Sequence, residues 1–174
     1  YRYNGFKLMT DIVHPDVMLS HDDWGSKTNL FLRPELWREL IKPHYQKAYD
    51  YMHDHGVIIM HHADSWCQSI VEDMVDLHID IWQGVLPQND IPAIQKQLDG
   101  RMALMGGVDS AVVDRPDSTE DEIRGDIRRV LKEYVPGGHF IPCITYGGPG
   151  TLYPNADRII NEEIDIYNKE HFGI

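Results

Sequence analysis

The sequence predicts an α/β protein in which parallel strands are covered by helices. Segments typical of strands and of helices alternate about five times along the 174 residues. The strand segments are apolar without period-two alternation, which is expected where both faces of a strand are buried. Because we find no linker, repeat or low-complexity stretch, residues 1–174 are predicted to form a single unit.

Five short apolar segments are predicted to be the strands. They are residues 17–20, 57–60, 79–82, 102–105 and 139–142. Each of them leads directly into polar or glycine-rich residues.

The segments between the strands carry apolar residues at helical spacing. The first helix is predicted over residues 34–56, where Pro34 suits the first turn and Pro43 should kink or split the helix. Another helix begins at Ser118-Thr119 and continues through the apolar stripe to Tyr134. The remaining helices are residues 70–75, residues 91–98 closed by Gly100, and a last helix with Ile159, Ile160, Ile164 and Tyr167.

Composition and charge exclude several classes of partner. Against 16 Lys and Arg stand 28 Asp and Glu, a formal net charge of -12 that opposes phosphate backbones and anionic membranes. Neither a stretch of about 20 apolar residues nor a signal peptide is recognisable. The charge therefore excludes nucleic acid and membrane as expected partners. The two cysteines, Cys67 and Cys143, cannot form a disulfide framework, so we expect the protein to act in a reducing cytoplasm.

Nearly every predicted strand ends in a polar or glycine-rich tag. The tags are Asp22-Asp23, His61-His62-x-Asp64, Gln83, Gly106-Gly107-x-Asp109 and Cys143-x-Thr145. In a barrel of parallel strands the active site is built from the carboxyl ends of the strands. The tags therefore predict one shared site.

The most chemically informative tag is His62-x-Asp64. Residues i and i+2 of an extended strand exit point to the same side, so an imidazole and a carboxylate can converge, and Cys143 could supply a third ligand. One nitrogen, one carboxylate and one thiolate with a position left open would suit catalytic zinc or another divalent transition metal. The alternatives are a hydrogen-bonded strand-end histidine and an inert buried thiol.

Other tags also have two interpretations each. Asp23 can contact a substrate or only cap a loop. Gly106 and Gly107 can admit a flat ligand or only permit close backbone packing. Cys67 is interpreted as a packing residue and His61 as a structural or supporting one. Neither a phosphate-binding loop nor a G-x-S-x-G motif competes with this site.

With these residues in place, the chain resembles the C-terminal half of the uroporphyrinogen decarboxylase superfamily, along almost its entire length. The likeness rests on Asp22-Asp23-Trp24-Gly25, MHHADSW, MGGVD and FIPCIT. Within that superfamily it is more similar to the corrinoid-dependent methyltransferases, and among these to the methylcorrinoid:tetrahydrofolate enzyme of glycine betaine demethylation. Their zinc signature is His-x-Cys with a distant Cys. His62 and Cys143 fall on it, whereas Asp64 replaces the first cysteine.

The resemblance implies an enzyme that moves a methyl group from a methylated corrinoid, either methylcobalamin or a corrinoid protein, to tetrahydrofolate. It implies that His62, Asp64 and Cys143 are metal ligands. We expect catalytic roles for Asp23 and Asp109. We expect cofactor contacts from Gln83, Gly106 and Gly107. With a single thiolate, the site suits a nitrogen acceptor. The alternatives are a thiol acceptor of the coenzyme M type, a decarboxylase, which would need arginines from an N-terminal segment, and a non-catalytic module that docks a corrinoid protein.

The resemblance also allows the chain length to be compared with that of a complete barrel. A (β/α)8 barrel of the TIM type uses roughly 250 residues, more than the chain provides. We therefore expect the C-terminal part of such a barrel, with parallel strands and outer helices, incompletely active by itself. An open half-barrel exposes two sheet edges, which predicts self-association as a homodimer.

Overall fold

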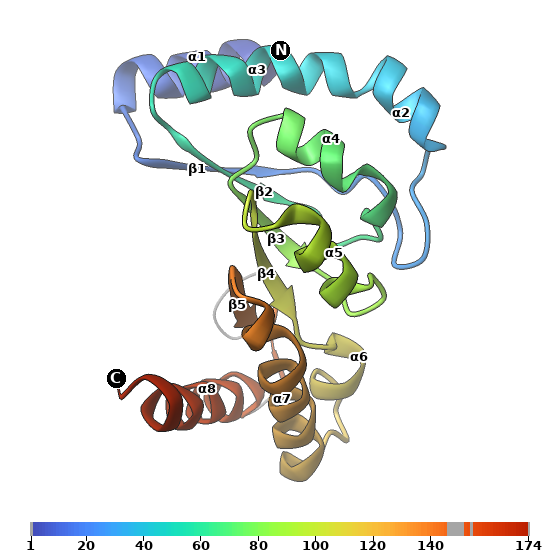
Figure 1. Cartoon of the computed structure of the whole chain (residues 1–174), viewed down its shortest axis with the longest axis vertical. Coiled ribbons are helices and arrows are strands. Elements are labelled where there is room, and N and C mark those ends of the chain that lie inside the picture. Colours follow the sequence, from blue (N-terminus) through green and yellow to red (C-terminus); the bar gives the residue numbers. More distant parts are fainter. Residues whose placement is uncertain (1, 146–151, 154, 174) are drawn as a thin grey trace.

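The protein folds around one sheet of five parallel strands in the order β1-β2-β3-β4-β5. The computed structural model describes residues 2–145, 152–153 and 155–173 (Figure 1). The strands are β1 (Val17–His21), β2 (Ile58–His62), β3 (Ile81–Val85), β4 (Ala103–Gly107) and β5 (Phe140–Cys143). The expected α/β class with parallel strands and outer helices is confirmed, and sequential neighbours without a crossover are the arrangement of a barrel segment.

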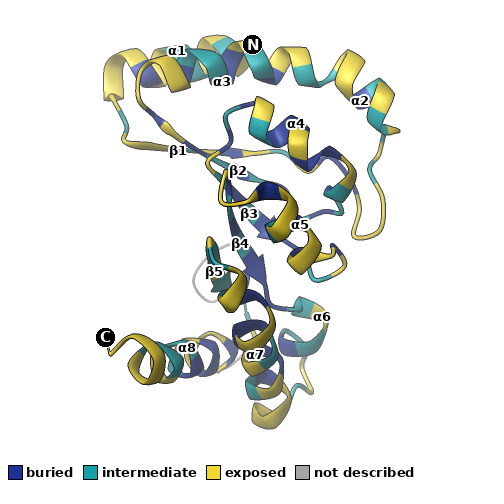
Figure 2. Cartoon of the chain, in the orientation of Figure 1, coloured by how far each residue is buried: buried dark blue, intermediate teal, exposed yellow. Residues whose placement is uncertain are grey.

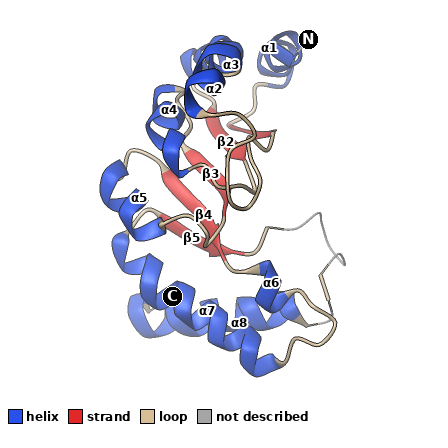
Figure 3. Cartoon of the chain, turned by 90° about the vertical axis from the view of Figure 1, so that its right-hand side faces the viewer, coloured by secondary structure: helices blue, strands red, loops and turns tan. Residues whose placement is uncertain are grey.

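Helices connect the strands and cover one face of the sheet, as Figure 3 shows for α2 to α5. They are α1 (Arg2–Val13), α2 (Pro34–Leu40), α3 (Lys42–Asp54), α4 (Val71–Asp76), α5 (Ile91–Leu98), α6 (Ser110–Val113), α7 (Glu120–Tyr134) and α8 (Ala156–Phe172), with short 3-10 turns η1 (Gln68–Ile70) and η2 (Val135–Gly137). None of the described helices is long and apolar enough to cross a membrane.

The two faces of the sheet differ in burial. Ile59, Trp82 and Leu104 point toward the helices and are almost fully buried. On the opposite face, which corresponds to the inside of a barrel, Leu19 is 57% and Ile58 is 44% exposed. Figure 2 shows this exposed colouring along β1. The core therefore lies between the sheet and the helices, and the inner face remains open.

The structure confirms the break predicted in the long first helix and adds two helices. α2 ends before Ile41, and Pro43 lies in the first turn of α3, where its missing N–H costs nothing. The added helices, α1 and α6, were not predicted from the sequence. α1 buries only Thr10 completely, so it lacks the continuous apolar stripe that identifies a helix.

The strands also end later than the apolar pattern predicts. Pairing of β2 continues through His62, and pairing of β4 continues to Gly107. His62 faces the open inner side of the sheet, whereas His61 is fully buried on the helix-covered face, where Tyr49 and the carbonyl of Asp22 satisfy its two ring nitrogens. The histidine and glycine tags therefore belong to the strands themselves.

Candidate functional site

A cavity of about 430 Å³ opens at the carboxyl ends of β1 and β2. It is lined by Leu19, His21, Asp23, His62, Asp64, Gln83 and Thr145. Four of the five predicted strand-end tags contribute residues to it: Asp23, His62 with Asp64, Gln83, and Thr145. The tag Gly106-Gly107-x-Asp109 and Cys143 do not line this cavity, so the single site expected from all five tags is found only in part.

His21, Asp23 and His62 form the polar centre of this cavity. One ligand atom from each lies within 4.8 Å of the others, and among the described residues no other group of three or more histidines, cysteines and acids is so close. His21 Nε2 is 3.9 Å from Asp23 Oδ2, and His62 Nε2 is 4.0 Å from Asp23 Oδ1. Register brings the two imidazoles together, because His21 pairs with His62 across β1 and β2.

Gln83 fixes the orientation of His62. Nδ1 of His62 donates a hydrogen bond to Oε1 of Gln83, a side-chain carbonyl that can only accept. In the neutral imidazole, Nε2 therefore carries the lone pair, and it points toward Asp23. A histidine held in this way through its other nitrogen is typical of a metal ligand. Gln83 thus orients His62, whereas the predicted cofactor contact of Gln83 stays a prediction.

His61 supports the loop that carries Asp23. Its Nε2–H donates to the carbonyl of Asp22 at 3.1 Å, and its Nδ1 accepts from the Tyr49 hydroxyl at 2.7 Å. Trp24 stacks on the imidazole with ring centroids 3.9 Å apart. Burial lowers the pKa of His61 to about 3, so the ring stays neutral. The sequence interpretation of His61 as a supporting residue agrees with these contacts.

Asn89 supports the second loop, which carries Asp64, and it was not identified from the sequence. Its buried side-chain oxygen accepts from the backbone N–H groups of Cys67 and Gln68, at 3.0 and 3.2 Å. Its amide donates to the carbonyl of Ser65. Asparagine is common in loops after strands, so the sequence does not distinguish Asn89 from an ordinary loop residue. Only the fold shows that its side chain joins the backbone of the loop that carries Asp64.

Asp64 and Cys143 lie near each other but line different cavities. Thr145 donates a hydrogen bond of 2.8 Å to Oδ1 of Asp64, which joins the exit of β5 to the exit of β2. Cys143 lines a neighbouring cavity of about 360 Å³, together with Gln83 and residues of α8. Burial, and then the charge of Asp64, raises the pKa of the Cys143 thiol to about 12. Joint metal binding by His62, Asp64 and Cys143 stays a prediction.

The two glycines of β4 are required by packing. Gly106 has a φ of +147°, and a Cβ there would lie 2.6 Å from the carbonyl oxygen of Val85. Gly107 has a φ of +82°, and a Cβ there would lie 2.8 Å from the ring of Phe140. The close-packing alternative accounts for both, so a contact with a flat ligand stays a prediction.

Asp109 has structural partners that leave its predicted catalytic role untested. Its carboxylate caps α6 by accepting from the N–H of Ala111 at 2.9 Å. Its own N–H donates to Asp126 at 2.8 Å. Asp23, by contrast, lies in the cavity, and its Oδ1 accepts from the N–H of Asp64 at 2.7 Å.

A parallel sheet in sequential strand order, covered by helices on one face and open on the other, is the arrangement of part of a barrel-type α/β protein, and a polar cavity lies at its strand ends. The family model of uroporphyrinogen decarboxylase matches residues 16–161, and the chain belongs to this family. Among solved structures it is similar to a methyltransferase from Methanosarcina mazei, with 20% sequence identity and a TM-score of 0.62. That likeness covers 87% of this chain and 42% of the methyltransferase, so the chain spans less than half the length of that relative. No curated protein sequence matches the chain.

Proposed function

We propose that the chain carries the acceptor site of an enzyme that moves a methyl group from a methylated corrinoid to tetrahydrofolate. The observation that carries this proposal is the Nε2 atom of His62, oriented by Gln83 toward Asp23 inside a strand-end cavity. The family and the fold shared with a protein named as a methyltransferase support the reaction class.

The side chains of the cavity fit a divalent metal ion. His62 offers a free imidazole nitrogen, and two carboxylates, Asp23 and Asp64, line the same cavity. A bound zinc ion, or another divalent transition metal, would supply Lewis-acid charge that polarises and orients an acceptor. The lining residues offer nitrogen and oxygen and no thiol, which favours a nitrogen acceptor over a thiol.

Methyl transfer to a nitrogen also requires a group that takes up a proton. The cobalt–methyl bond of the donor breaks and leaves its electron pair on the corrinoid, an N–CH3 bond forms, and the methylated nitrogen releases its own proton. Thr145 orients the Asp64 carboxylate through a hydrogen bond to Oδ1, and the carboxylate lines the cavity. We assign to it the role of proton acceptor. The partner that presents the methyl donor is proposed to be a corrinoid protein, and the site of action the cytoplasm.

The test is demethylation of methylcobalamin, followed optically with tetrahydrofolate or a thiol offered separately to the zinc-loaded chain. The chain spans less than half the length of the related methyltransferase and is expected to be incompletely active by itself, so we expect slow but measurable turnover with tetrahydrofolate. We expect this turnover to be lost in His62→Ala. His53→Ala is the matched control, because His53 lies on α3 and stacks on His78 away from the cavity. Turnover with the thiol alone would establish the coenzyme M-type alternative. Turnover with neither acceptor would overturn the proposal.

A further inference from the structure

We infer that the metal ion of this site is held by His21, Asp23 and His62, with Cys143 outside its coordination sphere. The inference rests on the proposed function, because it names the ligands of the same site. It differs from the ligand set implied by the family resemblance in two of three residues. Strand register and the contacts of the cavity carry it.

Register brings the two histidines together without any loop rearrangement. His21 and His62 are paired residues on neighbouring strands, so both imidazoles leave the same face of the sheet, with ring centroids 4.3 Å apart. Asp23 follows His21 by two residues and is held by the N–H of Asp64. Cys143 pairs with Gly107 on β4, so β3 and β4 separate its strand from β2.

The distances within the group leave room for an ion between the side chains. His62 Nε2 lies 4.0 Å from one carboxylate oxygen of Asp23, which is too far for a hydrogen bond. His21 Nε2 lies 3.9 Å from the other oxygen of the same carboxylate. At these distances neither imidazole is hydrogen-bonded to Asp23, so the carboxylate and both ring nitrogens can turn toward a shared ion.

The spacing fits a first-row divalent ion once the side chains move inward. Ligand atoms about 2.1 Å from a tetrahedral ion lie about 3.4 Å apart. The two histidine–carboxylate distances of 3.9 and 4.0 Å must therefore contract by roughly half an ångström, and the remaining separation, which is within 4.8 Å, by at most about 1.4 Å. The His21 side chain is 66% exposed, which leaves it room to move inward toward Asp23, whose carboxylate is held by the N–H of Asp64. Two imidazoles and one carboxylate, with positions left open, bind ions such as Zn²⁺, Co²⁺ and Fe²⁺.

Charge also distinguishes the two ligand sets. Two neutral imidazoles and one carboxylate leave a divalent ion with a net charge of +1. A set with a carboxylate and a thiolate would leave the ion neutral. The inferred set therefore makes a stronger Lewis acid, and it favours acceptors or water bound through oxygen or nitrogen.

Binding of Co²⁺ to the metal-free chain tests the inference without any activity measurement. We expect one ion per chain, with a d–d spectrum that lacks a thiolate-to-cobalt charge-transfer band. His21→Ala and Asp23→Asn should each weaken Co²⁺ binding at least tenfold, as His62→Ala should. Cys143→Ser should leave the affinity and the spectrum unchanged, and His53→Ala serves as the control for removing a histidine. Circular dichroism checks that each variant is folded.

Each outcome has a defined meaning. A thiolate band that disappears in Cys143→Ser, or full Co²⁺ affinity in His21→Ala, would overturn the inference. Failure of the chain to bind Co²⁺ or Zn²⁺ would overturn it as well. If His21→Ala loses the ion while the intact zinc-loaded chain transfers no methyl group, the inferred ligands stand and the proposed function fails.

Discussion

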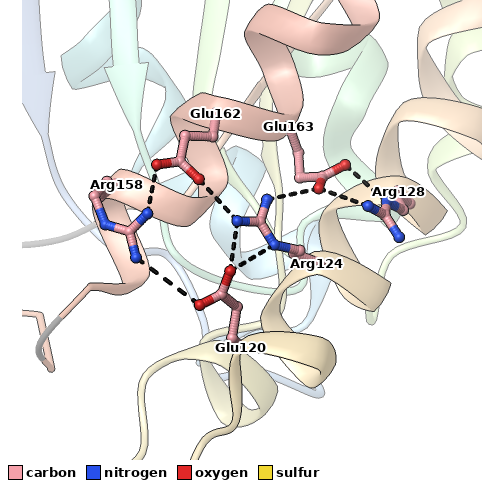
Figure 4. A network of polar contacts seen from close by, with 6 residues as sticks. All are labelled: Glu120, Arg124, Arg128, Arg158, Glu162 and Glu163. Carbon is pink, nitrogen blue, oxygen red and sulfur yellow. Dashed lines mark hydrogen bonds and ion pairs between the residues drawn. The ribbon is translucent and has the colours of Figure 1, made fainter.

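Arg124 of α7 and Glu163 of α8 form an ion pair of 2.8 Å at the contact between the two helices. Glu163 is only 4% exposed and also binds Arg128 at 2.7 Å. Figure 4 shows the network, which consists of Glu120, Arg124, Arg128, Arg158, Glu162 and Glu163. Because α8 lines the cavity beside Cys143, these pairs hold one wall of that cavity in place.

Glu163→Gln tests how much the buried carboxylate contributes to the free energy of unfolding. We expect the free energy of unfolding at pH 7 to fall by about 1–3 kcal/mol, because two guanidinium groups lose their buried anionic partner. Urea denaturation measures it. Glu162→Gln is the matched control, since its side chain is 40% exposed, and it should cost less than about 1 kcal/mol. Equal losses in both variants would show that burial of Glu163 adds nothing.

The same variant has a predicted pH signature. The hydrogen bond from Arg128 is the largest influence on the pKa of Glu163, and together with a smaller one from Arg124 it holds that pKa below its usual range, although burial by itself raises it. A carboxylate with a lowered folded-state pKa stabilises the fold above its unfolded-state pKa, and this contribution is lost as the pH falls through the folded value. The stability difference between wild type and Glu163→Gln should therefore shrink in acid. A constant difference between pH 7 and acid pH would contradict the assignment.

Removing the buried imidazole of His61 should affect both stability and metal binding. His61→Leu deletes the hydrogen bonds to Asp22 and from Tyr49, and we expect a loss of about 2–4 kcal/mol in unfolding free energy. It should also weaken Co²⁺ binding at least tenfold, because the loop that positions Asp23 is released. Ile127→Ala, in the core on α7, should destabilise by a similar amount, about 2–5 kcal/mol, with Co²⁺ affinity intact. Equal metal affinities in the two variants would show that His61 is structural only.

The pH dependence of stability provides a second measure of His61. Its folded-state pKa of about 3 lies below the ordinary value of 6.5, so the unfolded chain takes up the proton first. The stabilisation from neutral His61 is present above pH 6.5 and declines as the pH falls toward 3. The unfolding free energy of His61→Leu should therefore fall less steeply than that of the wild type as the pH is lowered from 6.5 toward 3. Identical pH slopes in both proteins between these values would exclude burial of a neutral imidazole.

Two glycine substitutions should act in opposite directions. In Gly106→Ala the Cβ would meet the carbonyl oxygen of Val85 at 2.6 Å with φ at +147°, so we expect a loss of about 2–5 kcal/mol. Gly125 lies on the exposed side of α7, where an added Cβ would meet nothing within 4 Å, so Gly125→Ala should gain about 0.5–1 kcal/mol. Thermal and urea unfolding measure both. A tolerated Gly106→Ala would reopen the interpretation of this glycine as a ligand contact.

The sequence pattern sufficed for the fold but for only part of the site. Apolar runs located all five strands, because burial under helices leaves a direct mark on composition. His21 was not singled out as a site residue, since its place beside His62 depends on the register of two strands about 40 residues apart. Asn89 was missed for the same reason, because its partners belong to a different loop. Local spacing revealed His62 and Asp64, whereas contacts between strand ends required the structure.

The open inner face of the sheet should drive the proposed homodimer. Leu19 is 57% exposed there, beside Val17 and Ile58, and Ile141 is exposed on β5, so a second copy would remove apolar surface from water. The net charge of -12 on each chain opposes this contact, so added salt should strengthen association. Leu19→Glu should shift the protein to monomer in light scattering and sedimentation. Leu40→Glu, at an exposed position of α2, is the matched control and should leave association unchanged. A monomer at every salt and protein concentration, or equal effects of both variants, would show that the inner face is not the contact.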